Sequence, residues 1–210
     1  AGRTALRLWP SWLVAPGPPR ASRELQDLLA RSPAGGLGAD ERARADALVD
    51  ELVAARAPFD PAFLGGGLWK AAYTRGDPPK WERNARLIPF VRNIAGQEYD
   101  PAAARVVNYG EVLGPSLHFR ADGTFSEVVP GARACPKDYE VFVESGGLSF
   151  FGVEIPLPIR GRGYLRCLYA DPGLRVFVSP RSSPDNWEDE GLIVVQIPMS
   201  TLEPSWRPPY

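Results

Sequence analysis

Two segments near the start of the chain carry apolar residues at helical spacing. In the first, 22–31, leucines recur three and four residues apart and Ser22 precedes them as a candidate N-cap. The second, 39–56, places alanine, leucine and valine on one stripe, with Asp40 as its candidate cap. The pattern predicts a lead-in of two helices over 22–64.

Beyond this lead-in, short runs of valine, tyrosine, phenylalanine and leucine alternate with turn residues at intervals of about ten residues. Regular short strands of this kind are typical of a sandwich or a barrel. We expect eight or nine strands over 65–198, enough to close an antiparallel up-and-down β-barrel that holds one small apolar ligand. The clearest predicted hairpin is HFRADGTF, with its turn at Asp122 and Gly123. The chain is therefore expected to be mainly β with N-terminal helices.

The predicted barrel is flanked by an extended arm at 1–21 and an extended tail at 199–210. Trp9 and Trp12 in the arm and Trp206 in the tail lie among prolines and are candidate partner-binding residues. The first 23 residues hold four arginines and no acidic residue. That composition fits the remnant of an organellar transit sequence, and it also fits a simple extended arm.

Composition narrows the class of protein. Lysine plus arginine numbers 24 against 25 for aspartate plus glutamate, so no strong field favours nucleic acid as a partner. No apolar run approaches the length of about 20 residues that a transmembrane helix needs, which favours a soluble or peripheral protein. Cys135 and Cys167 have no metal-ligand spacing and are expected to be ordinary thiols in a reducing compartment.

The sequence offers little catalytic chemistry. Its one histidine, His118, lies in a predicted strand, and neither a G-x-S-x-G elbow nor a phosphate-binding loop occurs. The acidic loop 185–190 lacks the spaced ligands of a calcium loop, so no metal site is predicted. We expect a non-catalytic protein; the alternative is a barrel enzyme for an apolar substrate that uses His118, Glu140 or Asp171 as acid–base groups.

Large apolar side chains in the predicted strands either fill a core or line a ligand cavity. On the second interpretation, the candidate ligand-binding residues are Tyr73, Phe119, Phe125, Phe142, Phe151, Tyr164, Leu168 and Val176.

The order of these features resembles the plastid lipid-associated protein family, the fibrillins of plants and algae. A "G-x-W-x-L-x-Y-T"-like first strand, a Gln followed by a "V-N" strand and a closing "Y-x-D-x-x-L-R" hairpin are similar to stretches of this chain. The resemblance extends over about 22–198. The matching positions are Gly67, Trp69, Tyr73, Thr74, Gln97, Val107, Asn108, Tyr169, Asp171, Leu174 and Arg175.

The resemblance implies a lipocalin-like barrel that binds lipids or other small hydrophobic molecules in chloroplasts, at thylakoids or at the lipid droplets called plastoglobules. It implies a lipid, carotenoid, quinone or chlorophyll-type pigment as ligand and no established catalysis. The alternative that the sequence leaves open is a non-catalytic accessory subunit of a large organellar membrane complex, for example a photosynthetic one, with a filled barrel.

Gly67-Leu68-Trp69 also fits the lipocalin G-x-W motif, in which the resemblance implies that an arginine from a late strand packs over the tryptophan. Arg175 is that arginine here, and Asp171 is expected nearby to compensate its buried charge. Trp69, Asp171 and Arg175 are therefore predicted to be a structural clasp. Arg166, in the same hairpin, is expected to point outward into solvent or onto a partner.

Overall fold

A computed structural model of the chain describes residues 17–32, 36–76, 94–179 and 191–202. Within these ranges, two helices are followed by a short 3-10 helix, nine strands and another 3-10 helix. The helices are α1 (Arg20–Arg31) and α2 (Ala39–Ala54), and the 3-10 helices are η2 (Pro61–Leu64) and η3 (Met199–Thr201). The strands are β1 (Leu68–Arg75), β2 (Ala95–Asp100), β3 (Arg105–Glu111), β4 (Leu117–Glu127), β5 (Lys137–Phe150), β6 (Val153–Leu157), β7 (Gly161–Ala170), β8 (Arg175–Ser179) and β9 (Leu192–Pro198).

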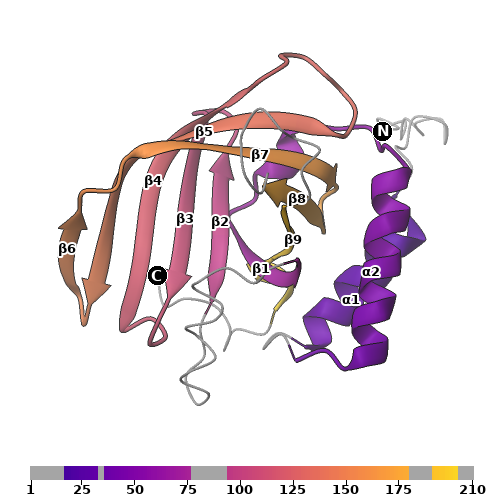
Figure 1. Cartoon of the computed structure of the whole chain (residues 1–210), viewed down its shortest axis with the longest axis horizontal. Helices are drawn as coiled ribbons and strands as arrows, with labels where there is room; N and C mark the ends of the chain where they lie inside the picture. The colour runs from indigo at the N-terminus through magenta and orange to yellow at the C-terminus, as the bar shows by residue number, and fades with distance from the viewer. Residues whose placement is uncertain (1–16, 33–35, 77–93, 180–190, 203–210) are drawn as a thin grey trace, which may run out of the picture.

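Eight strands close an antiparallel barrel in the order β1-β2-β3-β4-β5-β7-β8-β9, and β9 pairs back onto β1. The ninth strand, β6, pairs only with the end of β5 and extends the sheet beyond the barrel. In Figure 1, β6 lies on the side of the molecule opposite the two helices. The predicted antiparallel up-and-down barrel of eight or nine strands is confirmed, with eight strands in the barrel and one extra.

The helices start at different residues from those predicted. α1 begins at Arg20, so Ser22 lies inside its first turn, where its hydroxyl donates to the carboxylate of Asp171 at 2.5 Å. α2 begins at Ala39, and the amide of Gly38 donates to the carboxylate of Glu41 at 2.9 Å. The caps are Pro19 and Gly38, so the predicted caps Ser22 and Asp40 are three and two positions too late. For Ser22 the reason is that sequence alone does not show its partner Asp171 far along the chain.

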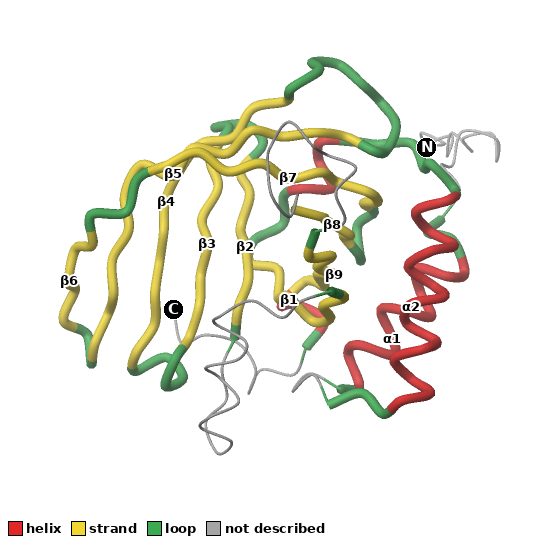
Figure 2. The backbone as a smooth tube through the Cα atoms, viewed as in Figure 1, coloured by secondary structure: helices red, strands yellow, loops and turns green. Residues whose placement is uncertain are grey.

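The two helices pack on the outside of the barrel (Figure 2). Their leucines, valines and alanines meet outward side chains of β1, β8 and β9, which form one buried cluster with them. Burial of this apolar face, rather than helix propensity, is the main source of helix stability. The barrel members of the cluster include Ala72, Tyr73, Val176, Val195 and Ile197, together with Leu174 from the β7–β8 turn.

One end of the barrel is plugged by the chain that precedes β1. Pro58 bridges to Ala134, and the amide of Phe59 donates to the carbonyl of Arg133 at 2.9 Å, so this segment lies against the β4–β5 loop. η2 follows and places Leu64 in the core inside the barrel. We call this end the closed end; the β3–β4 turn and the β5–β6 hairpin lie at the other, the open end.

The predicted HFRADGTF hairpin is wrong. Asp122 and Gly123 lie in the middle of β4, which runs unbroken from Leu117 to Glu127. Gly123 serves close strand approach instead, because a Cβ there would lie 2.2 Å from the carbonyl oxygen of Phe142. The Asp-Pro-Gly turn between β7 and β8, by contrast, is a turn as predicted.

Several predictions concern residues outside those that the structure describes. They include the arm tryptophans Trp9 and Trp12, Trp206 in the tail, and the acidic loop 185–190. Among the residues that are described, no helix is both long enough and apolar enough to cross a membrane.

Candidate ligand site inside the barrel

The half of the barrel interior next to the closed end is filled by the protein's own side chains. The ring of Tyr99 packs edge-on to Phe125 and stacks with Phe177, at centroid distances of 5.1 and 6.0 Å. Phe125 also packs against Tyr139, at 5.7 Å. This aromatic core, with Cys167 and Val106, leaves the closed half solid.

Arg175 stands at the centre of the closed half and is fully buried. Its guanidinium carbon lies 3.6 Å from the ring centroid of Trp69, as the resemblance implied. Its nitrogens donate to three carbonyls of the plug, those of Phe63, Leu64 and Gly65. The indole nitrogen of Trp69 donates to the same Gly65 carbonyl at 2.9 Å. Arg175 therefore fixes the plug to the barrel.

Asp171 does not compensate the charge of Arg175 as predicted. One of its carboxylate oxygens accepts from Ser22 and, at 2.6 Å, from the hydroxyl of Tyr169. The other accepts from the amides of Gly173 and Leu174, both at 2.7 Å. Asp171 thus ties α1 to the β7–β8 turn. The charge of Arg175 is instead stabilised by carbonyl dipoles and an indole face, and its burial lowers its pKa to about 9.

Three amide side chains form a polar layer above the aromatic core. Gln196 donates to Gln97 at 2.7 Å, and Gln97 donates to Asn108 at 2.6 Å. Gln196 is only 2% exposed, and its Oε1 accepts no hydrogen bond from any described residue. A buried acceptor without a donor is costly, so a donor inside the barrel would be stabilised there.

The half of the interior next to the open end is lined by very small residues. Gly110 continues the inward face of Val106, and Gly161 and Gly163 pair with Val143 and Val141 on the inward face of β5. A Cβ at any of these three glycines would meet no other atom of the described residues within 4 Å. The described residues therefore leave space next to these glycines in the open half.

The walls of the open half are apolar and partly accessible. Phe119 pairs with Leu148 on the same inward face, and both side chains are half-buried. The next inward position on β4, Ala121, is small and buried. Inward positions thus change from fully buried aromatics at the closed end to partly exposed apolar residues at the open end, as expected of a cup.

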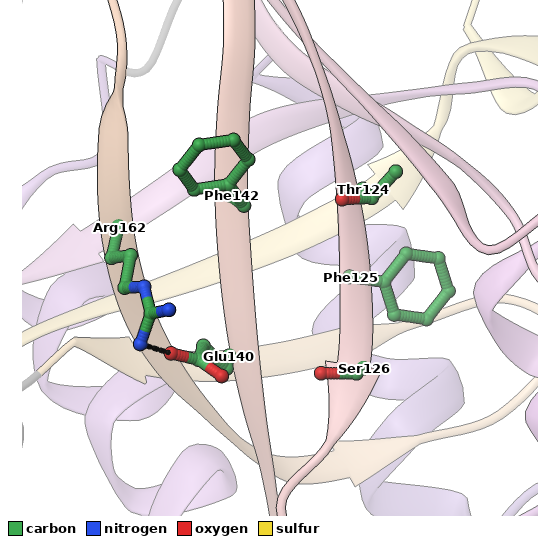
Figure 3. Close-up of a pocket in the computed structure, with 6 residues that line it drawn as sticks. All are labelled: Thr124, Phe125, Ser126, Glu140, Phe142 and Arg162. Carbon is green, nitrogen blue, oxygen red and sulfur yellow. Dashed lines mark hydrogen bonds and ion pairs between the residues drawn. The ribbon is translucent and has the colours of Figure 1, made fainter.

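A second hollow lies on the outer face of β4, β5 and β7 (Figure 3). It has a volume of about 410 Å³ and is open to solvent. Arg162 pairs with Glu140 at 3.0 Å at its edge, and Phe142 projects beside them. Thr124 and Ser126 also line it, together with Phe125, whose ring points away into the barrel interior. Its mixed, exposed lining favours it less than the barrel interior as a site for an apolar ligand.

The eight predicted ligand-binding residues do not form one lining. Phe119 and Phe125 face inward, at the open and closed halves respectively. Phe151 lies at the tip of the β5–β6 hairpin and is strongly exposed. Three others pack outward toward the helices, and two lie on the outer face around Glu140. The first set is Tyr73, Leu168 and Val176, and the second is Phe142 and Tyr164.

The candidate acid–base groups lie apart, each with its own partners. His118 bonds through Nδ1 to the Pro115 carbonyl at 2.9 Å, Glu140 accepts from Arg162 and Tyr164 on the outer face, and Asp171 is buried beside α1. No group of three or more His, Cys, Asp or Glu within the described ranges is arranged to hold a metal ion. Arg166 points outward and pairs with Asp138 through two nitrogens, at 2.6 and 3.1 Å.

The features that mark the cup were missed in the sequence. Gly110 gives no distinct signal, and the "GRGY" stretch, Gly161 to Tyr164, is interpreted from sequence as a turn, whereas it begins β7. Gln196 falls within a predicted apolar strand. The available signal was a glycine every second residue in the "GRG" start of β7, which leaves one face of the strand bare.

Comparison of the chain with protein families, with curated proteins and with solved structures found no match. The fold and the arrangement of the interior therefore carry the functional argument.

Proposed function

We propose that this protein binds a small hydrophobic molecule or lipid in the open half of its barrel and does not catalyse a reaction on it. The observation that carries the proposal is the space that the described residues leave at the inward glycines Gly110, Gly161 and Gly163. Apolar walls partly open to solvent expose surface that an apolar ligand would cover, and covering it contributes about 25 cal/mol per Å².

The amide layer supports a ligand with one polar end. A hydroxyl or N–H group that reached the floor of the cup would donate to the Oε1 of Gln196, which lacks a donor among the described residues. The remaining apolar part would lie between Phe119 and Leu148. A polar-headed apolar molecule thus fits the interior better than a pure hydrocarbon.

Titration with the fluorescent lipid cis-parinaric acid tests the proposal. Wild-type protein should bind it saturably, and Gly163→Leu, which places a side chain in the cup, should weaken binding about tenfold or more. Thr124→Leu, which alters only the outer hollow, is the matched control and should bind like wild type. Absence of saturable binding by the wild-type protein, or equal loss in both variants, would overturn the proposal.

A second candidate is a non-catalytic accessory subunit of a large organellar complex. The solid aromatic core of the closed half favours it, because half of the barrel serves stability alone. Size-exclusion of native extracts tests it, since a subunit would run far above the 22.9 kDa of the chain. A chloroplast location at thylakoids or plastoglobules stays a prediction from the resemblance, which fractionation of the source cells tests.

A further inference from the structure

The exposed apolar side chains of the described residues gather at one end of the molecule. Six of the eight large ones lie in the β3–β4 turn or the β5–β6 hairpin, both at the open end. They are Val112, Leu113, Phe150, Phe151, Val153 and Ile155, and we call them the apolar tip. Such a concentration is uncommon on a surface that faces only water.

The two segments that form the tip carry no basic side chain. Residues 112–117 and 146–153 contain no ionisable side chain, and Glu154 lies between the tip residues Val153 and Ile155. The other nearest ionisable residues along the chain are Glu111 and His118. The tip therefore matches an uncharged apolar phase and offers no particular attraction to an anionic surface.

Part of the backbone of the tip is already paired. The amide of Phe151 donates to the Ser116 carbonyl at 2.7 Å, and the amide of Val112 donates to the Leu117 carbonyl at 2.8 Å. β5 and β6 pair from Gly146 and Leu157 to Phe150 and Val153, while the other edge of β6 pairs with no described strand. The paired groups would keep their partners on leaving water, which lowers the cost of placing this backbone in hydrocarbon, whereas the outer edge of β6 would lose its water.

The shape and position of the tip distinguish between two possible apolar binding partners, a lipid layer and a protein. The hairpin projects on the side opposite the helices (Figure 1), and Phe151 at its turn is 72% exposed. A fluid acyl layer closes around a projecting side chain, whereas a protein partner needs a preformed pocket. Phe150 and Ile155 also lie on the same face of the sheet as Phe119 and Leu148 inside the cup.

From these observations we propose that the apolar tip inserts into the surface of a lipid layer that carries no net charge, and that it holds the open end of the barrel against this layer. The proposal goes beyond ligand binding, because the tip would dock whether or not the cup is filled. Docking in this orientation gives an apolar molecule a path from the lipid layer into the barrel without crossing water.

Flotation of the full chain with phosphatidylcholine vesicles tests the proposal. Wild-type protein should float with them, with little change between low and high salt. Phe151→Asn/Val153→Ser should lower the partition coefficient about tenfold or more. Asparagine suits position 151, whose φ is +48°. Val128→Ser/Val129→Ser, at the closed end, is the matched control and should float like wild type.

Insertion is then measured directly. Val153→Cys and Val129→Cys, at positions 62% and 63% exposed, are labelled with an environment-sensitive dye, while native Cys135 and Cys167 are buried. When vesicles are added, only the fluorescence emission of the label at position 153 should shift to shorter wavelength. Flotation that needs anionic lipid, equal behaviour of the two labels, or a tip that binds only protein would overturn the proposal. Parinaric acid binding without vesicles would persist in each case, which separates this failure from that of the cup.

Discussion

Arg175 is a buried cation held without a carboxylate. Its guanidinium stacks on the Trp69 ring and donates hydrogen bonds to the carbonyls of the plug, while its Nη1 has no partner in the described part of the chain. Arginine suits this role because its planar, weakly hydrated guanidinium can stack on an aromatic ring and donate hydrogen bonds at the same time. A single side chain thereby joins the plug, the first strand and the eighth strand.

Replacing Arg175 by methionine should destabilise the protein by about 3 kcal/mol. The change leaves the Phe63 and Leu64 carbonyls without their Arg175 donors, leaves Gly65 with the Trp69 indole alone, and removes the stack on Trp69. Urea unfolding followed by tryptophan fluorescence measures it. Arg166→Met, which breaks only the partly exposed pair with Asp138, is the control and should cost about 1 kcal/mol or less. Equal effects of the two variants would contradict the clasp role.

Lys70 is buried on β1, and its ammonium meets only the Ala71 carbonyl, at 3.3 Å, among the described groups. Burial lowers its pKa from 10.5 to about 8. Between these two values the unfolded chain binds the proton that the folded chain has lost, so stability rises with pH across this window. Below it, the buried charge costs roughly 3 kcal/mol.

Lys70→Met should therefore be more stable than wild type at neutral pH, and its advantage should shrink as pH rises from about 8 toward 10.5. Thermal unfolding of the two proteins at matched pH values measures the difference. A constant difference across this range would show that Lys70 is not a buried cation.

At the scale of strands, bulges decide which face a side chain takes. Simple alternation from Trp69 would turn Tyr73 inward, but the register shifts between Ala71 and Tyr73, and Tyr73 bonds to Asp46 on α2 instead. A shift between Cys167 and Tyr169 has the same result for Tyr169. The strand positions were readable from hydrophobic runs, but these faces were not, because a bulge leaves no clear mark in one sequence.

Gly123→Ala should destabilise the barrel by about 1 to 3 kcal/mol, because its Cβ would meet the Phe142 carbonyl where β4 crosses closest to β5. Gly110→Ala, which enters open space, should change stability by less than about 1 kcal/mol. The melting temperatures of both variants, measured by calorimetry, give the two losses of stability for comparison. Similar losses would mean that the space at Gly110 is already filled.

At the scale of the molecule, the sequence supports the order of helices and strands, and the resemblance supports the stack of Arg175 on Trp69. The division of the interior into a solid half and an open half depends on packing between residues distant in the chain, such as Tyr99 with Phe177. The plug, too, depends on its pairing with the β4–β5 loop. Hydrophobic patterning reports which faces are apolar, and it does not report whether facing side chains meet.

The closure of β1 on β9 has a consequence for the order of folding. Every other strand pair in the barrel joins neighbours along the chain, separated at most by β6, so the meander can assemble locally. The β1–β9 pair can form only when the first and the last strand of the barrel come together. The helices pack over this pair through Val195 and Ile197. Val195→Ala should therefore speed unfolding while leaving the folding rate nearly unchanged in stopped-flow measurements. The helices would then pack onto the barrel late in folding, and their packing would set the rate at which the barrel unfolds.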